Sequence, residues 1–308
     1  MKLVIVGQGK MGAQISMQLL EAGHQVTAMD PNPASLTAAV QKGAQTSTDR
    51  AQAAAQFVGQ SQPPIIWLMI PSPLVEAELA AWLEVLPAAS IIVDGGNSDF
   101  RDSQKRGQLA AQKSIDFVDV GVSGGVLGLE KGFSMMVGGK QAAYQTLEPV
   151  FKAMAKDQGG YQYFGPDYGA GHFVKMVHNG IEYGVMESLA EGYRLLHDGP
   201  YQGLDLAAAG HVWQRGSVIE SELNALAAQA LKANPELSGV DGYVAESGEA
   251  RWALEAAKDK QIDMPAIQIA LEVRKASQQG QVNFATKLLA ELRNQFGGHD
   301  INKPKPAN

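Results

Sequence analysis

The sequence contains no cysteine among its 308 residues. A chain without cysteine forms no disulfide and offers no thiolate, either as a nucleophile or as a metal ligand. It also lacks a long apolar run, because its most apolar stretch, IIWLMI at 65–70, is far shorter than the roughly 20 residues that cross a membrane. The opening MKLVIVGQG goes directly into a strand-like run and leaves no room for a signal peptide. We therefore expect a cytoplasmic protein.

Positive charge is scarce as well. The chain has 25 lysines and arginines against 32 aspartates and glutamates, which gives a formal net charge of −7. This balance argues against a surface for nucleic acid or for an anionic membrane, so the expected partner is a small molecule. A length of 308 residues is sufficient for two domains of roughly 100–200 residues each.

Strand-like and helix-like segments alternate through the first half of the chain. The expected strands are short and apolar, and they cover 3–7, 25–30, 64–70, 90–95, 117–122, 133–139 and 161–165. The helix-length segments between the first five strands are 11–23, 33–43, 49–57, 73–86 and 103–112. Apolar strands that alternate with helices indicate a parallel sheet covered on both faces. The sequence thus predicts an α/β fold with a Rossmann-type doubly wound parallel sheet.

The second half of the sequence predicts only helices. Their expected ranges are 168–197, 204–232, 246–259, 263–279 and 282–296. We place the domain boundary near Gly165, so that a dinucleotide-binding domain over 1–165 precedes an all-α domain over 166–308.

The segment GQGKMG at 7–12 has the spacing G-x-G-x-x-G, follows an expected strand and opens an expected helix. In this setting the first glycine permits a tight turn, the second lets the backbone approach a pyrophosphate, and the third allows close helix–strand packing. The phosphates then lie at the helix N-terminus. A purely structural glycine turn is the alternative. The residues of the predicted dinucleotide site in this loop are Gly7, Gly9, Lys10, Met11 and Gly12.

An acidic residue, Asp30, ends the second expected strand. A carboxylate there accepts hydrogen bonds from ribose hydroxyls and repels a 2′-phosphate. Pro31 and Asn32 supply no cation that could hold that phosphate, so the sequence favours NAD over NADP. The loop after the third major strand, with Met69, Ile70 and Pro71, is a candidate contact for the nicotinamide, although a plain proline-rich turn explains it nearly as well.

Two further glycine loops, DGGNS at 94–98 and GVSGG at 121–125, follow neighbouring expected strands. Asn97 and Ser123 place hydrogen-bonding side chains on them, at the edge of the sheet where ligands of such folds bind. Plain turns are the alternative interpretation.

The segment KMVHNGIEYG at 175–184 brings Lys175, His178, Asn179 and Glu182 to positions i, i+3, i+4 and i+7 of an expected helix. This spacing defines one helix face. The flanking residues are too apolar for a freely exposed helix, which leaves a buried polar seam between helices or an acid/base site in a groove.

Together, GQGKMG, WLMIP, DGGNS, DVGVSGG, KMVHNGIEYG and the late FGGH closely resemble the 6-phosphogluconate dehydrogenases of the pentose phosphate pathway. The resemblance runs nearly end to end and is strongest to the short bacterial form with an aspartate after the second strand. It implies oxidative decarboxylation of 6-phosphogluconate to ribulose 5-phosphate and CO₂, with hydride transfer to NAD and no metal. A β-hydroxyacid dehydrogenase acting on a non-phosphorylated substrate is the alternative.

The resemblance also implies roles for individual residues. Lys175 is the general base and Glu182 the general acid. The sugar acid is held by Asn97, Ser123, Gly124, Gly125, His178 and Asn179, of which Asn97 also contacts the cofactor. Its phosphate is surrounded by Tyr183, Arg251, Arg274, Arg293 and His299. The family has a threonine where this sequence has Ala253. The resemblance finally implies a homodimer, or a dimer of dimers, in which the C-terminal segment with Arg293 and His299 completes the partner's site.

Overall fold

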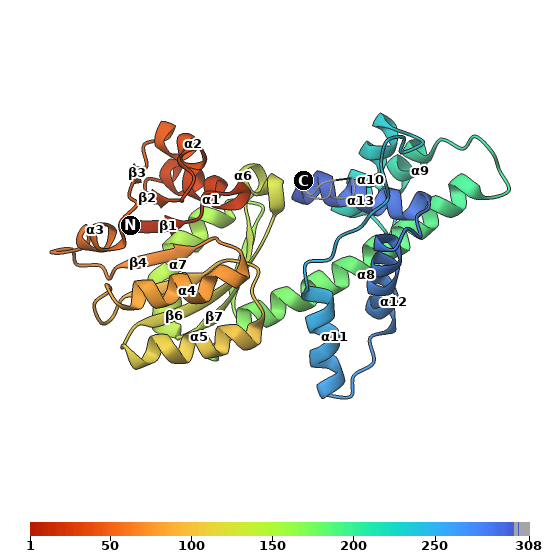
Figure 1. The fold of residues 1–308 in the computed structure, drawn as a ribbon. Coiled ribbons are helices and arrows are strands. Elements are labelled where there is room, and N and C mark those ends of the chain that lie inside the picture. The colour runs from red at the N-terminus through yellow and green to blue at the C-terminus, as the bar shows by residue number, and fades with distance from the viewer. Residues whose placement is uncertain (299–300, 302–308) are drawn as a thin grey trace, which may run out of the picture. The chain divides into compact units, whose positions relative to one another are not determined.

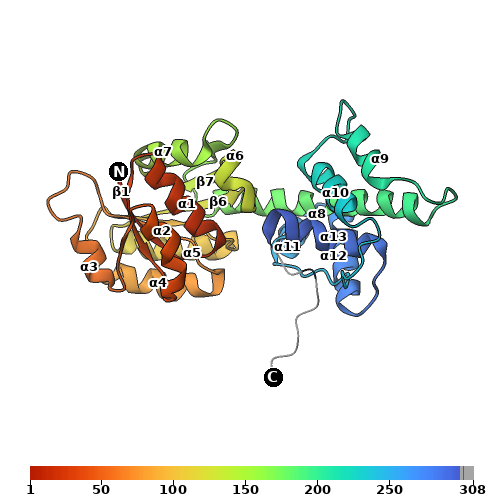
Figure 2. The same cartoon turned by 90° about the horizontal axis from the view of Figure 1, so that it is seen from above.

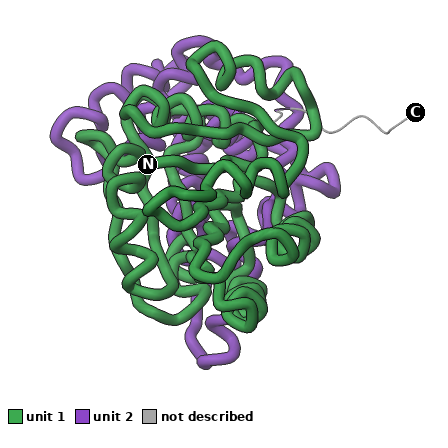
Figure 3. Tube along the Cα trace, turned by 90° about the vertical axis from the view of Figure 1, so that its left-hand side faces the viewer, with its two compact units in different colours: residues 1–176 green, residues 177–308 purple. Residues whose placement is uncertain are grey.

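The structure is a computed structural model that describes residues 1–298 and 301. The chain divides into two compact units, Met1–Met176 and Val177–Asn308, which Figure 3 colours separately. The division falls inside one long helix, α8 (Ala170–Asp198). The domain boundary near Gly165 stays a prediction.

The first unit is built on one sheet of eight strands within residues 1–176. Their order is β3-β2-β1-β4-β5-β6-β7-β8. The bounds are β1 (Lys2–Val6), β2 (Gln25–Met29), β3 (Gln45–Thr46), β4 (Ile65–Leu68), β5 (Ile91–Asp94), β6 (Asp116–Ser123), β7 (Ser134–Gly139) and β8 (Gly160–Tyr163). The order reverses between β1 and β4, as in a doubly wound dinucleotide-binding fold. The predicted Rossmann-type fold class is confirmed.

One pairing departs from the expected parallel sheet, since β6 and β7 run antiparallel. Only residues 124–133 connect them, and they form two short turns of helix, η2 (Gly125–Leu127) and α6 (Gly128–Lys131). A parallel crossover needs a dozen or more residues, so this connection can only return the chain in the opposite direction.

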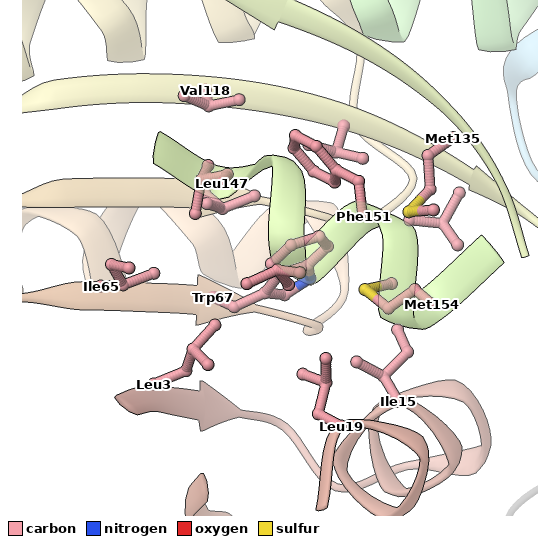
Figure 4. Close-up of a cluster of buried hydrophobic side chains, with 14 of the residues drawn as sticks. Leu3, Ile15, Leu19, Ile65, Trp67, Val118, Met135, Leu147, Phe151 and Met154 are labelled. Carbon is pink, nitrogen blue, oxygen red and sulfur yellow. The ribbon is translucent and has the colours of Figure 1, made fainter. Parts of the chain in front are cut away.

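Helices cover both faces of the sheet (Figure 1). They are α1 (Lys10–Glu21), η1 (Pro33–Leu36), α2 (Thr37–Gln41), α3 (Arg50–Ala55), α4 (Ser72–Leu83), α5 (Phe100–Gln112) and α7 (Gln141–Ala155). Successive strand residues point to opposite faces. In β1, Leu3 and Ile5 pack in the core with α1 and α7, whereas Val4 and Val6 pack in the core with α3, α4 and α5. Figure 4 shows the first of these cores, with Trp67 of β4 among side chains of α1 and α7.

The described residues of the second unit form helices joined by loops, without strands. After α8 come α9 (Leu206–Trp213), α10 (Glu222–Ala233), α11 (Glu249–Asp259), α12 (Pro265–Gln278) and α13 (Phe284–Gly297). α10 packs against α9 and α13, and α11 packs against α12 (Figures 1 and 2). The predicted all-helical region is confirmed.

Two element predictions differ from the structure. The single helix expected over 204–232 is two helices, because Gly216 takes φ = 82° and the Ser221 side chain caps a new helix by accepting from the Asn224 N–H. A left-handed glycine followed by an N-cap serine ends one helix and begins the next. In addition, α7 has no counterpart among the predicted helices.

Candidate functional site

The glycine loop between β1 and α1 forms an open cradle. Gly7 has φ = 90°, and a side chain on it would collide with the Met69 carbonyl. A side chain on Gly12 would collide with the Gly7 carbonyl, so both positions require glycine. Gly9, the N-cap residue of α1, instead faces open space, and no side chain caps the first turn. The free space at a helix N-terminus fits a pyrophosphate.

The other residues predicted for this loop lie in the first turn of α1. Lys10 is exposed, and Met11 is half-buried against the core between the sheet and α1. They therefore occupy the first turn of the helix whose N-terminus forms the cradle.

Asp30 directly follows β2 and is tied to the glycine loop. Its carboxylate accepts the Gln8 N–H at 2.7 Å through one oxygen and the Asn32 N–H at 2.8 Å through the other. Pro31 and Asn32 are exposed. The structure thus places a half-buried carboxylate beside the cradle, where the ribose of a dinucleotide is expected.

The loops after β4 and β5 lie beside the cradle. The Met69 N–H donates to the Val6 carbonyl at 2.7 Å. A side chain on Gly7 would lie 2.8 Å from the Ile70 side chain, and one on Gly96 would lie 2.8 Å from the Ile70 carbonyl oxygen. The loop with Met69, Ile70 and Pro71 and the loop with the exposed Asn97 therefore stand side by side at the carboxyl edge of the sheet.

Lys175 is positioned by one face of β6. Val118, Val120 and Val122 point into the core under α7, so the alternate residues of β6 point to the other face. There, a side chain on Gly121 would occupy the place of the Lys175 Cβ. The missing side chain lets α8 approach the sheet, and Lys175 is 9% exposed.

The start of α8 is held by Asp119, two residues before Gly121 on the same face of β6. Its carboxylate is fully buried and accepts the Gly169 N–H at 2.7 Å and the His172 N–H at 2.9 Å. These are N–H groups at a helix N-terminus, which favours a negative charge. Asp119 was absent from the predicted site, because a lone aspartate inside a strand-like run carries no signal of a cap to a distant helix.

Ser123 ends β6 on the same face as Gly121. The glycines that follow take φ = 140° at Gly124 and 52° at Gly125. Left-handed backbone of this kind favours glycine and turns the chain sharply after Ser123. The structure thus brings Ser123 and Lys175 to one face of the sheet in the first unit.

In the second unit, α8 carries a polar chain of contacts. His178 Nδ1 lies 2.9 Å from Asn179 Oδ1, and Asn179 Nδ2 donates to Glu249 Oε1 at 2.8 Å. Glu249 is buried in the first turn of α11. Sequence reasoning missed it, since a glutamate in a first helical turn is ordinarily explained by the helix dipole. Glu182 is half-buried one turn further along α8.

Arg274 on α12 is 1% exposed and has an unusual environment. Its guanidinium carbon lies 3.2 Å from the Tyr183 ring centroid, and Nη2 lies 3.8 Å from the Met186 sulfur. Nε and Nη1 are buried and have no hydrogen-bond partner among the residues that the structure describes. Burial lowers the pKa of Arg274 to about 10, with a further contribution from Arg293.

Arg293 on α13 belongs to the same cluster. It is 6% exposed, and burial lowers its pKa, while Tyr183 and Glu249 act in the opposite direction. Burial disfavours the charge of both guanidiniums, and Arg293 further disfavours that of Arg274, so a dianion fits as their partner. The cluster of Tyr183, Arg274 and Arg293 thus has the chemistry of a phosphate pocket within one chain.

One predicted phosphate residue is not part of this cluster. Arg251 is exposed on α11, pairs with Glu246 at 3.4 Å and lines a groove beside α12. His299 lies outside the described residues. Ala253, where the family has threonine, is buried on α11.

Within residues 1–298 and 301, no group of three or more histidines and carboxylates has a metal-binding arrangement. No helix in this part of the chain is long and apolar enough to span a membrane.

Family profiles account for almost the whole chain. Residues 2–165 match the NAD binding domain of 6-phosphogluconate dehydrogenase, and residues 171–302 match the C-terminal domain of the same enzyme. The chain belongs to the 6-phosphogluconate dehydrogenase family. The predicted family is therefore confirmed.

Individual relatives of this family align over nearly the full length. YqeC of Bacillus subtilis (strain 168) is 36% identical over 304 residues, which is 98% of this chain and 100% of the relative. The NAD(+)-dependent, decarboxylating 6-phosphogluconate dehydrogenase of Haloferax volcanii is 37% identical over 303 residues, 98% of each chain. The 6-phosphogluconate dehydrogenase of Plasmodium falciparum superposes with a TM-score of 0.79 at 24% identity, covering all of this chain and 67% of that one, and shares the fold.

Proposed function

We propose that the protein oxidises and decarboxylates 6-phosphogluconate to ribulose 5-phosphate and CO₂, with NAD as the hydride acceptor. The observation that carries this proposal is the buried cluster of Tyr183, Arg274 and Arg293, in which Nε and Nη1 of Arg274 have no hydrogen-bond partner among the described residues. In a chain of this family, such a cluster fits the phosphate of the substrate. A non-phosphorylated β-hydroxyacid offers no phosphate to the buried Nε and Nη1 of Arg274, which argues against the alternative function.

The residues of α8 supply the proton chemistry. Lys175 accepts the proton of the C3 hydroxyl group while the hydride leaves C3. NAD, when bound, accepts that hydride. The protonated Lys175 then donates a hydrogen bond to the new C3 ketone, and the bond from the carboxylate carbon to C2 breaks to release CO₂. Glu182 protonates the remaining enediol at C1 of the product.

The surrounding residues orient the substrate in this scheme. We assign Asn97, Ser123, Gly124 and Gly125 to the sugar acid, together with the linked side chains of His178 and Asn179. Glu249 fixes the Asn179 amide by accepting from Nδ2. This contact selects one orientation of the amide, so that its oxygen faces His178.

We further propose that NAD is preferred over NADP. The carboxylate of Asp30 lies beside the glycine loop, and Pro31 and Asn32 supply no cation for a 2′-phosphate. We expect at least a roughly tenfold higher kcat/KM with NAD, equal to about 1.4 kcal/mol of transition-state discrimination. Kinetics with both cofactors test this, and the Asp30→Ala variant should narrow the difference. Equal efficiency with both cofactors in the wild type would contradict the assignment.

A homodimer is the proposed active unit. On α8, Ile181 is 55% and Val185 41% exposed, and the open glycines Gly184 and Gly192 lie on the same helix. An exposed apolar stretch with small residues fits close packing against a second copy of the chain. We propose that Arg293 serves the phosphate pocket of its own chain, because it is buried there near Arg274. The cross-subunit contribution that the resemblance implies then depends on His299 and the residues after it.

The function is tested by mixing the protein with NAD and 6-phosphogluconate and by following NADH and released CO₂ together. We expect the two products in equal amounts. NADH without CO₂, or turnover of only non-phosphorylated 3-hydroxy acids, would support the β-hydroxyacid dehydrogenase instead.

A further inference from the structure

A buried ion pair in the first unit joins the two loops that follow β4 and β5. Arg106 on α5 and Asp94 at the end of β5 are both buried, and Nη1 of Arg106 lies 3.0 Å from Oδ2 of Asp94. The same nitrogen donates to the Ser98 hydroxyl at 3.0 Å, and this hydroxyl donates to Asp94 at 2.8 Å. Asp94 also accepts the Gly96 N–H at 3.1 Å, so the β5 loop is fixed from inside.

The second terminal nitrogen of Arg106 reaches the end of the other loop. Nη2 donates at 3.1 Å to the backbone carbonyl of Ser72, the first residue of α4, which directly follows Pro71. One planar guanidinium therefore contacts the β5 loop and the residue that anchors the loop 69–71 to α4. Lysine cannot replace it, because a single ammonium lacks the two divergent donor nitrogens.

The strand order places these loops beneath one half of a bound dinucleotide. The cradle lies after β1 and the ribose carboxylate after β2, whereas β4 and β5 lie on the opposite side of β1. A dinucleotide that crosses the sheet at this point has its nicotinamide over the loops after β4 and β5. Burying an ion pair brings little net stability compared with an apolar pair, so its role is better explained by geometry.

We propose that Arg106 is a positioning residue that fixes the spacing between the loops 69–71 and 95–98 and thereby the orientation of the nicotinamide ring. The inference rests on the proposed function for its kinetic consequence. It predicts that loss of the guanidinium fork impairs the nicotinamide half of the site and leaves the adenosine half intact.

The test compares Arg106→Lys with Arg101→Lys, the same substitution on the same helix at an arginine that pairs with Asp99 at the start of α5. Titration with ADP-ribose, which lacks nicotinamide, should give a dissociation constant within about twofold of the wild type for both variants. The fluorescence enhancement of bound NADH, which reports on the nicotinamide environment, should fall at least about threefold in Arg106→Lys only. In the same variant kcat should fall about tenfold or more.

Two results would overturn the proposal. In the first, Arg106→Lys keeps the NADH fluorescence and the kcat of the wild type. In the second, Arg106→Lys loses ADP-ribose binding in parallel with kcat, which indicates a merely structural role. If Arg106→Lys does not fold, Ser98→Ala decides, because it removes one contact of the fork without exposing a charge. It should lower NADH fluorescence about twofold, and an unchanged signal would refute the role. A wild type that binds NADH but does not oxidise 6-phosphogluconate would refute the proposed function alone.

Discussion

Lys175 lies where its stem replaces a side chain on Gly121, and burial separates it from solvent. We predict that Lys175→Met lowers the rate of NADH formation by at least about 10³-fold, because no other group is proposed to accept the hydroxyl proton. The dissociation constant for NAD should remain within about twofold. Lys152→Met, an exposed position on α7, is the matched control and should keep full activity. Near-native turnover of Lys175→Met would disprove the proposed base.

Glu182 acts after hydride transfer in the proposed mechanism. Glu182→Gln should therefore reduce steady-state turnover by about 10²-fold or more, in the range of a lost general acid, while a first burst of NADH persists. Stopped-flow absorbance of a single turnover measures the two steps separately. A burst that is lost together with turnover would place Glu182 before the hydride step.

Glu187 is a buried carboxyl of α8 that the mechanism does not use. Burial raises its pKa to about 7, and Glu191 adds to this effect, while Arg274 opposes it. The folded state therefore holds a proton that the unfolded state releases above about pH 4.5, so stability is lost as pH rises from about 4.5 to about 7. Glu187→Gln removes this loss and should raise the free energy of unfolding by about 2 kcal/mol at pH 8.

Urea denaturation at pH 4 and pH 8 checks this prediction. At pH 4 the variant and the wild type should have nearly equal stability, since Glu187 is mostly protonated there in both the folded and the unfolded state. Glu191→Gln, an exposed position one turn along α8, should change stability by less than about 0.5 kcal/mol at either pH. An advantage of Glu187→Gln that is the same at both pH values would contradict a titrating carboxyl.

The sequence indicated residue chemistry better than residue environment. Lys175 stood out because polar groups interrupt an apolar helix, whereas Tyr183 and Arg274 were assigned from the family resemblance, and the structure buries all three. Arg251 looked equivalent to Arg274, yet it is exposed and paired with Glu246. Burial depends on which helices meet, so a pattern within one helix does not reveal it.

At the scale of elements, the start of α8 depends on Asp119 in β6. Asp119→Asn leaves one oxygen for two N–H donors and turns an N–H group of the amide toward a donor. We predict a loss of about 1–3 kcal/mol in the free energy of unfolding and a fall in kcat, because α8 carries Lys175. Asp205→Asn, which caps α9 through the Ala208 N–H, is the control and should alter neither by much, since asparagine caps a helix equally well. A normal kcat in Asp119→Asn would show that the cap of α8 does not affect the reaction at Lys175.

The elements also show where sequence patterns lose information. Strands β1, β2, β4, β5 and β6 could be predicted because consecutive residues enter cores on both faces, which keeps each strand apolar. β3 was not predicted, since its two residues, Gln45 and Thr46, are polar and exposed. The break between α9 and α10 could not, because the apolar spacing resumes after Gly216 with almost no interruption. The direction of β7 depends on the length of a connection, and strand periodicity carries no record of direction.

At the scale of the whole molecule, the proposed dimer predicts that Arg293 acts in the site of its own chain, whereas His299 acts in the site of the partner subunit. Refolding Lys175→Met together with His299→Ala should restore activity, because a mixed dimer then has one site with an intact lysine and an intact partner tail. Random pairing makes about half of the dimers mixed with one complete site of two, so about a quarter of the sites recover. Lys175→Met mixed with Arg293→Ala should recover nothing, since Arg293 is proposed to act in its own chain.

Sedimentation of differently sized tagged chains must show that the subunits exchange in both mixtures. Recovery with Arg293→Ala would mean that this arginine crosses the interface, and no recovery with His299→Ala would mean that His299 does not.

The two faces of β6 have different roles, which limits the changes in length that this strand can accept. One face of the strand carries Asp119, Gly121 and Ser123 in succession, and the valines that alternate with them point into the core on the other face. A one-residue insertion or deletion early in the strand exchanges the two faces. Such a change would turn Asp119 into the apolar core and place a valine against α8. The cap of α8 by Asp119, the close approach at Gly121 and the position of Ser123 would then be lost together. We infer that this chain tolerates substitutions within β6 better than a change in its length, and that length changes are tolerated only in the turns at its ends.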